Sequence, residues 1–165
     1  MRIYALLLLL TFSITSMAFM SGIDPSRDKQ GELDIIGATI PLAPANASVN
    51  AGYVKFTNTS DKDVEFYRFT SPVYDSVEMH ITENKSGSAK MKQVKKILVP
   101  ANSSIELKPG GAHLMLIGPR REVKAGEQVL IIAQDSLERR FMLKFTVVDL
   151  RHDNAKSHDH SHHNH

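Results

Sequence analysis

The sequence predicts an all-β protein, an antiparallel sandwich or barrel. Short runs of apolar or alternating residues recur along the chain, and no long run repeats with the period of a helix. Many short strands separated by turns are typical of sandwiches and barrels. The expected strands are Leu33–Ile40, Gly52–Asn58, Val64–Thr70, Val77–Thr82, Lys90–Val94, Ser104–Leu107, His113–Ile117, Gln128–Ala133 and Phe141–Val148.

Turn-forming residues lie between several of these runs. Residues 58–61 separate the second run from the third, and residues 84–88 separate the fourth from the fifth. Residues 108–111 precede the seventh run, and residues 124–127 precede the eighth. Asn, Asp, Ser, Gly and Pro are frequent in these segments because they suit turn geometry. With no internal repeat, we predict one domain over residues 33–150.

The two ends of the chain differ from this domain. Residues 1–18 predict a cleaved export signal, since Arg2 precedes an apolar run from Ile3 to Ile14 and small residues follow. A membrane anchor is the alternative, but the run is shorter than the roughly twenty residues that cross a bilayer. Residues 19–32 predict a flexible lead-in, and residues 151–165 predict a disordered, histidine-rich tail.

Composition excludes several classes of protein. The formal net charge is only +2, which argues against a nucleic-acid partner, and the basic run from Lys90 to Lys96 is typical of a solvated hairpin. The chain has no cysteine, which excludes thiolate zinc sites, dithiol redox chemistry and the cysteine-containing blue-copper site. No nucleophile elbow, phosphate-binding loop or HExxH motif is found, so we predict that the protein is not an enzyme.

Two residues of the seventh run indicate metal chemistry. Because side chains two apart share one face of a strand, Leu114 and Leu116 should face the core, with His113 and Met115 on the other side. The same alternation assigns Met79 to the core and His80 to the polar face. Glu78 is then either a solvated charge or a partner of His80.

Met91 completes a possible set of four ligands. It lies between two lysines, an unusual neighbourhood for a buried methionine, and it would approach His80 if residues 77–82 and 90–94 pair as a hairpin. Thioether sulfur selects copper(I), and imidazole suits copper in either oxidation state. Taken singly, each methionine is explained as well by core packing and each histidine by a hydrogen bond.

The spacing of these four residues is more specific than any one of them. Ten residues separate His80 from Met91, twenty-one separate Met91 from His113, and one separates His113 from Met115. This pattern resembles the periplasmic copper chaperones of the PCuAC family. Residues 51–54, 71–73 and 106–116 also resemble family segments, although Ala112 is smaller than usual and an early tryptophan is missing.

The resemblance implies a cupredoxin-like or immunoglobulin-like β-sandwich in the periplasm. Such a protein would bind Cu(I) through His80, Met91, His113 and Met115. It would act as a monomer without a membrane span after signal cleavage, and deliver copper toward the CuA centre in subunit II of cytochrome c oxidase. A thioredoxin-like copper assembly protein would supply the thiols that this chain lacks.

The tail suggests a second, weaker metal site. Clustered imidazoles bind Cu(II), nickel or zinc, and this tail contains no methionine, so it favours Cu(II). Interspersed Asp, Ser and Asn favour a native tail over a purification tag. The possible secondary ligands are His152, His158, His160, His162, His163 and His165.

Two alternatives to a copper carrier remain. The protein would act as a periplasmic copper-buffering, storage or resistance protein if it binds copper without specific delivery. It would be an immunoglobulin-like adhesion or assembly module if its His and Met residues are incidental. Replacing Met91 and Met115 by alanine distinguishes these hypotheses, because the Cu(I) affinity of an adhesion module would not change.

Overall fold

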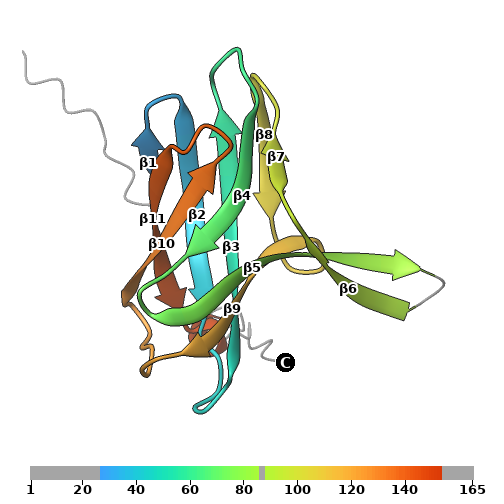
Figure 1. The fold of residues 1–165 in the computed structure, drawn as a ribbon. Coiled ribbons are helices and arrows are strands. Elements are labelled where there is room, and N and C mark those ends of the chain that lie inside the picture. The colour runs from blue at the N-terminus through green and yellow to red at the C-terminus, as the bar shows by residue number, and fades with distance from the viewer. Residues whose placement is uncertain (1–26, 86–87, 154–165) are drawn as a thin grey trace, which may run out of the picture.

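The computed structural model describes residues 27–85 and 88–153, which form a closed antiparallel β-sandwich (Figure 1). The predicted all-β fold is confirmed. One helical turn, α1 (Leu150–Asp153), follows the last strand. The strands are β1 (Arg27–Gln30), β2 (Leu33–Pro41), β3 (Val49–Asn58), β4 (Val64–Thr70), β5 (Tyr74–Lys85), β6 (Ser88–Val94), β7 (Ile97–Val99), β8 (Ser103–Leu107), β9 (Ala112–Pro119), β10 (Gln128–Asp135) and β11 (Arg140–Val148).

The order of the strands closes the sheet on itself. Hydrogen-bonded neighbours run β2-β11-β10-β4-β5-β9-β3, and β3 then pairs with β2. The pairing of β11 with β2 is parallel, while the other pairings are antiparallel. Closure leaves few exposed edges in the body of the molecule, which limits unwanted pairing with other chains.

All nine predicted strands are present, and two further strands were not predicted. β7 has only three residues, and β1 has no apolar residue, so neither shows a recognisable pattern. β1 pairs with β2, from Arg27 opposite Ile36 to Gln30 opposite Leu33. The last part of the predicted flexible lead-in is therefore a strand of the sandwich, because backbone pairing with β2 orders it.

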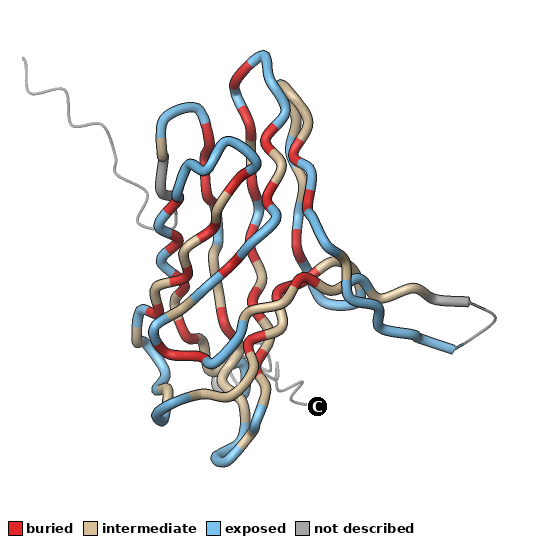
Figure 2. The backbone as a smooth tube through the Cα atoms, in the orientation of Figure 1, coloured by how far each residue is buried: buried red, intermediate tan, exposed pale blue. Residues whose placement is uncertain are grey.

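Buried residues alternate with more exposed ones along the strands (Figure 2), and most of the buried residues are apolar. Phe66 lies at the centre of an aromatic cluster, with its ring centroid 5.1 Å from that of Phe56, 5.6 Å from Phe69 and 5.5 Å from Phe141. Aromatic pairs in this range add about 0.5–1.5 kcal/mol beyond the burial of their surface. The core supplies the stability that disulfides supply in many exported proteins.

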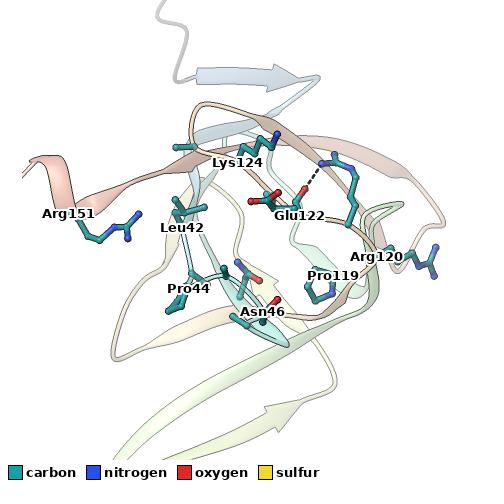
Figure 3. Close-up of a pocket in the computed structure, with 15 residues that line it drawn as sticks. Leu42, Pro44, Asn46, Pro119, Arg120, Glu122, Lys124 and Arg151 are labelled. Atoms are coloured by element: carbon teal, nitrogen blue, oxygen red, sulfur yellow. Dashed lines mark hydrogen bonds between the residues drawn. The ribbon is translucent and has the colours of Figure 1, made fainter.

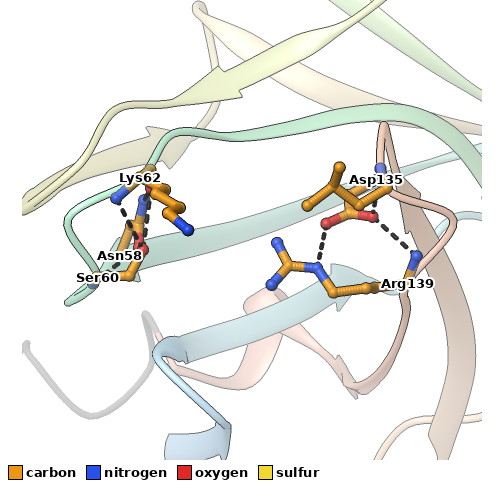
Figure 4. A network of polar contacts seen from close by, with 6 residues as sticks. Asn58, Ser60, Lys62, Asp135 and Arg139 are labelled. Atoms are coloured by element: carbon orange, nitrogen blue, oxygen red, sulfur yellow. Dashed lines mark hydrogen bonds and ion pairs between the residues drawn. The ribbon is translucent and has the colours of Figure 1, made fainter.

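Buried polar side chains at the β3–β4 and β10–β11 turns form hydrogen bonds (Figure 4). The Asp135 carboxylate, 1% exposed, accepts hydrogen bonds from the backbone N–H groups of Leu137 and Arg139 and from the Arg139 side chain at 2.6 Å. The Asn58 amide donates to the backbone carbonyl of Lys62 at 2.7 Å, and its carbonyl oxygen accepts from Ser60. These networks hold the turns that join the strands.

One part of the molecule leaves the sandwich. β5 continues past the body and pairs there with β6, so the two strands form a projecting hairpin (Figure 1). The first six residues of β6 are exposed, including Lys90 and Lys92, as expected for a solvated hairpin. Since β6 pairs only with β5 within the described residues, its outer edge faces solvent.

Candidate metal centre

The hairpin considered above for residues 77–82 and 90–94 is present as the pair β5–β6. His80 lies opposite Gln93, and Thr82 lies opposite Met91. Residues opposite one another share a face of an antiparallel pair, and so do residues two apart on one strand. His80, Thr82 and Met91 therefore share one face of the hairpin, with Met91 diagonal to His80.

β9 continues this face on the other side of β5. His80 lies directly opposite His113, and Glu78 lies directly opposite Met115. The two imidazole rings are 5.9 Å apart between centroids and inclined by 36°. The backbone register alone thus brings together two histidines that are far apart in the sequence.

The opposite faces of the same strands belong to the core. Leu114 and Leu116 are fully buried, and Met79 is only 6% exposed. This confirms the predicted alternation of β9 and the assignment of Met79 to the core. Met91 differs, because 51% of its surface is exposed on the projecting hairpin.

His113 is held by the turn that enters β9. Residues 108–111 form a turn with a positive φ of 74° at Gly110 and a Gly111 N–H to Lys108 carbonyl hydrogen bond of 3.1 Å. Pro followed by Gly at the two central positions is the pattern of a type II turn. The Gly111 carbonyl lies 3.1 Å from His113 Nδ1 and also accepts from the Thr82 N–H at 3.1 Å.

His80 is held by the carboxylate of Glu78. The distance between His80 Nε2 and Glu78 Oε2 is 2.8 Å, and both side chains are partly buried. Of the two roles considered for Glu78, the structure thus favours a partner of His80. No sequence pattern indicated that the Gly111 carbonyl is a partner of His113, although the Pro109-Gly110 pair indicated the turn that presents this carbonyl.

The other ring nitrogen of His80, Nδ1, has no hydrogen-bond partner within the described part of the chain. Nδ1 is buried and receives no hydrogen bond from the described residues. A buried polar atom without a partner costs about 1–3 kcal/mol, and such atoms are rare in native proteins. A metal ion bound at Nδ1 would satisfy this atom.

β3 borders the same face with small and neutral side chains. Ala51 lies opposite Met115, so the thioether has a methyl group beside it rather than a bulky neighbour. Tyr53 follows on the same side of β3, and partial burial raises the pKa of its hydroxyl above the usual value. The phenol therefore stays neutral at physiological pH.

The donors on this face fit a soft cation. Within residues 27–85 and 88–153, no three His, Cys, Asp or Glu side chains gather to hold a metal. A metal here would depend on the thioethers of Met91 and Met115, which bind hard ions poorly and copper(I) well. The donor set is thus suited to copper(I) rather than to magnesium, calcium or a thiolate-bound zinc.

Most of the described chain matches the model of a known protein family. Residues 33–132 match the model of the family described as "LpqE-like: Putative lipoprotein LpqE-like". The chain belongs to this family. It is 30% identical over 88 residues to a protein described as "Putative lipoprotein Lxx21020" from Leifsonia xyli subsp. xyli, a match that covers 53% of each chain. It spans about half the length of the curated relatives that it matches.

Solved structures with the same fold include copper-bound proteins. The solution structure of CuI-DR1885 from Deinococcus radiodurans is 30% identical, with a TM-score of 0.57 over 68% of this chain and 76% of the other. The copper-bound PCuAC domain from PmoF2 has a TM-score of 0.63 over 74% of this chain and 97% of that domain. At 16% identity, the second comparison establishes the fold alone.

The two ends of this LpqE-like chain lie largely outside the described residues. The predicted export signal lies outside the described residues, as do all the tail histidines except His152, which is part of α1. Within the described residues no helix is long and apolar enough to span a bilayer. The chain has no cysteine, so it offers no thiol for the attachment of a lipid.

One cavity of the LpqE-like domain lies away from His80 and His113. It has a volume of about 820 Å³ and opens at the Pro119 end of β9, whereas His113 is at the other end of that strand (Figure 3). Its three arginines are all paired with carboxylates: Arg120 with Asp75, Arg121 with Glu127 and Arg151 with Asp149. This pairing leaves none of the three to attract an anion.

Proposed function

We propose that this protein is a copper carrier of the periplasm. It binds one Cu(I) ion through His80, Met91, His113 and Met115. The observation that carries the proposal is the opposition of His80 and His113 across β5 and β9, with an unpartnered Nδ1 on His80. The 30% identity to the Cu(I) protein from Deinococcus radiodurans supports the same metal.

The donor set suits delivery better than catalysis or electron transfer. It contains no thiolate to hold the ion irreversibly, so copper can pass to a stronger site. We propose the CuA centre in subunit II of cytochrome c oxidase as the destination. A thioredoxin-like copper assembly protein would supply thiols and electrons, since this chain has no cysteine.

Exposure of one ligand supports transfer to another protein. Met91 lies on the projecting hairpin with half of its surface exposed, while His113 is only 7% exposed. An acceptor approaching the hairpin would meet Met91 first. Replacement of this weakly bound thioether by an acceptor ligand would then begin the transfer.

The decisive experiment is Cu(I) titration with X-ray absorption on protein that lacks residues 151–165. We expect one Cu(I) per chain, with both nitrogen and sulfur ligands. Nitrogen and oxygen ligation without sulfur would contradict the proposal. Transfer of Cu(I) to the copper-free soluble domain of subunit II would then separate a carrier from a copper-buffering protein, which would retain its ion.

The tail is proposed as a second site for Cu(II). Its clustered imidazoles lose copper when they are protonated, whereas the methionines of the core site do not titrate. Titrations of the full chain with Cu(I) and Cu(II) at about pH 7.5 and pH 5.5 test this difference. Equal losses of both ions at the lower pH would rule out a separate tail site.

A further inference from the structure

The hydrogen bond between Glu78 and His80 determines which nitrogen of His80 is available. An ionised carboxylate has only acceptor atoms, so the hydrogen atom of the 2.8 Å contact belongs to His80 Nε2. In the neutral ring the lone pair then lies on Nδ1. That atom is buried and has no partner among the described residues.

His113 is held in the opposite tautomer. Its contact at 3.1 Å is with the Gly111 carbonyl, which also has only lone pairs, so His113 Nδ1 carries the hydrogen. The lone pair of this ring lies on Nε2. The two opposed imidazoles therefore present different nitrogens as possible metal ligands, although they share one face and lie 5.9 Å apart.

We propose that Glu78 is a positioning residue for copper. It holds His80 so that Cu(I) binds Nδ1 of His80 and Nε2 of His113. This inference rests on the proposed function, because it assumes that both histidines bind Cu(I). Carboxylate partners of this kind fix the orientation and tautomer of metal-binding histidines in many proteins.

Burial explains why this orientation matters. A half-turn of the ring exchanges Nε2 with the carbon Cε1, so it would remove the 2.8 Å hydrogen bond with the Glu78 carboxylate. The side chain of His80 is only 12% exposed, so water cannot readily replace its hydrogen bond with Glu78. Glu78 also brings a negative charge next to a ligand of a cation, which favours the bound ion.

Nitrogen-15 NMR of the full-length, copper-free chain tests the inference directly. Correlations between ring protons and ring nitrogens, recorded at about pH 8, distinguish the two tautomers of a neutral histidine. We expect His80 to carry its hydrogen on Nε2 and His113 to carry it on Nδ1. On addition of Cu(I), the signals of His80 Nδ1 and His113 Nε2 should shift most.

Two substitutions of Glu78 separate positioning from general stability. Glu78→Ala should lower Cu(I) affinity about 10–100-fold and leave His80 in a mixture of tautomers. Glu78→Gln keeps an acceptor oxygen and should retain the Nε2–H tautomer and Nδ1 binding. Glu122→Ala removes an exposed glutamate from the loop after β9 and should change neither property.

The possible failures are distinguishable. Hydrogen on His80 Nδ1 in the copper-free chain, or Cu(I) bound through His80 Nε2, would overturn the inference while the copper carrier stands. Wild-type affinity and tautomer in Glu78→Ala would overturn the positioning role as well. If the chain binds no Cu(I), the proposed function fails and this inference fails with it.

Discussion

The two faces of β5 and β9 are made from alternating residues of the same short segments, but they have different physical roles. On the inner face, Leu114, Leu116 and Met79 are packed into the core. On the outer face, His80 and His113 oppose one another and Met115 lies opposite Glu78. The inner residues are interchangeable with other apolar groups of similar size, whereas the outer ones depend on specific donor atoms.

The methionines show this difference within one residue type. Met79 and Met91 belong to the same hairpin, yet they are 6% and 51% exposed. A buried thioether fills space, and an exposed thioether beside imidazoles is free to bind a soft metal. We therefore expect substitutions on the two faces to change stability and the proposed metal binding separately.

Leu114→Ala should give the largest effect. Removal of a fully buried leucine leaves a cavity, and we expect the free energy of unfolding to fall by about 2–5 kcal/mol. Urea denaturation measures the change. Met115→Ala, the neighbour on the outer face, should cost clearly less; an equal loss for the two variants would break the distinction between the faces.

Met91→Ala should weaken Cu(I) binding by about 100-fold, because even groups that only support a metal ligand typically contribute 10–100-fold. Its free energy of unfolding should change by less than about 0.5 kcal/mol, as for other exposed positions. Competition with a Cu(I) chelator measures the affinity. Met79→Ala is the matched control, with the opposite expectation: lower stability and unchanged affinity in the folded protein.

Asp135→Ala tests a buried polar group whose partners are all present. Loss of this carboxylate leaves the backbone N–H groups of Leu137 and Arg139 without an acceptor, and we expect a loss of about 1–3 kcal/mol. Thermal unfolding monitored by circular dichroism measures it. Cu(I) affinity should not change, since this turn lies outside β5, β6 and β9; a weaker site would show that the two regions are coupled.

Glu127→Gln should give the smallest effect, and one that depends on pH. The hydrogen bond from Arg121 lowers the pKa of Glu127 below its usual value. The ionised carboxylate therefore stabilises the fold above about pH 4.5, its ordinary pKa, and the benefit disappears as pH falls through the lower folded pKa. Unfolding curves of wild type and variant should differ slightly at pH 7 and converge at about pH 3. A gap that widens in acid would contradict this assignment.

Much of the fold was predictable because it depends on local patterns. Each of the nine predicted strands is present, since alternation and turn residues mark them. β1 and β7 were missed because one is wholly polar and the other has three residues. The pairing of residues 77–82 with residues 90–94 was also predicted, because a short turn restricts a hairpin to neighbouring strands.

The alternation of side chains along a strand predicts that His113 and Met115 share one face and that His80 lies on the polar face of its strand. The sequence also excluded thiol chemistry, through the absence of cysteine. The position of His80 opposite His113 could not be predicted in this way. It requires β5 and β9 to pair in one particular register, and these strands are not consecutive in the sequence. The hydrogen bonds that the two rings donate to the Glu78 carboxylate and the Gly111 carbonyl likewise depend on burial and distances that no local pattern contains.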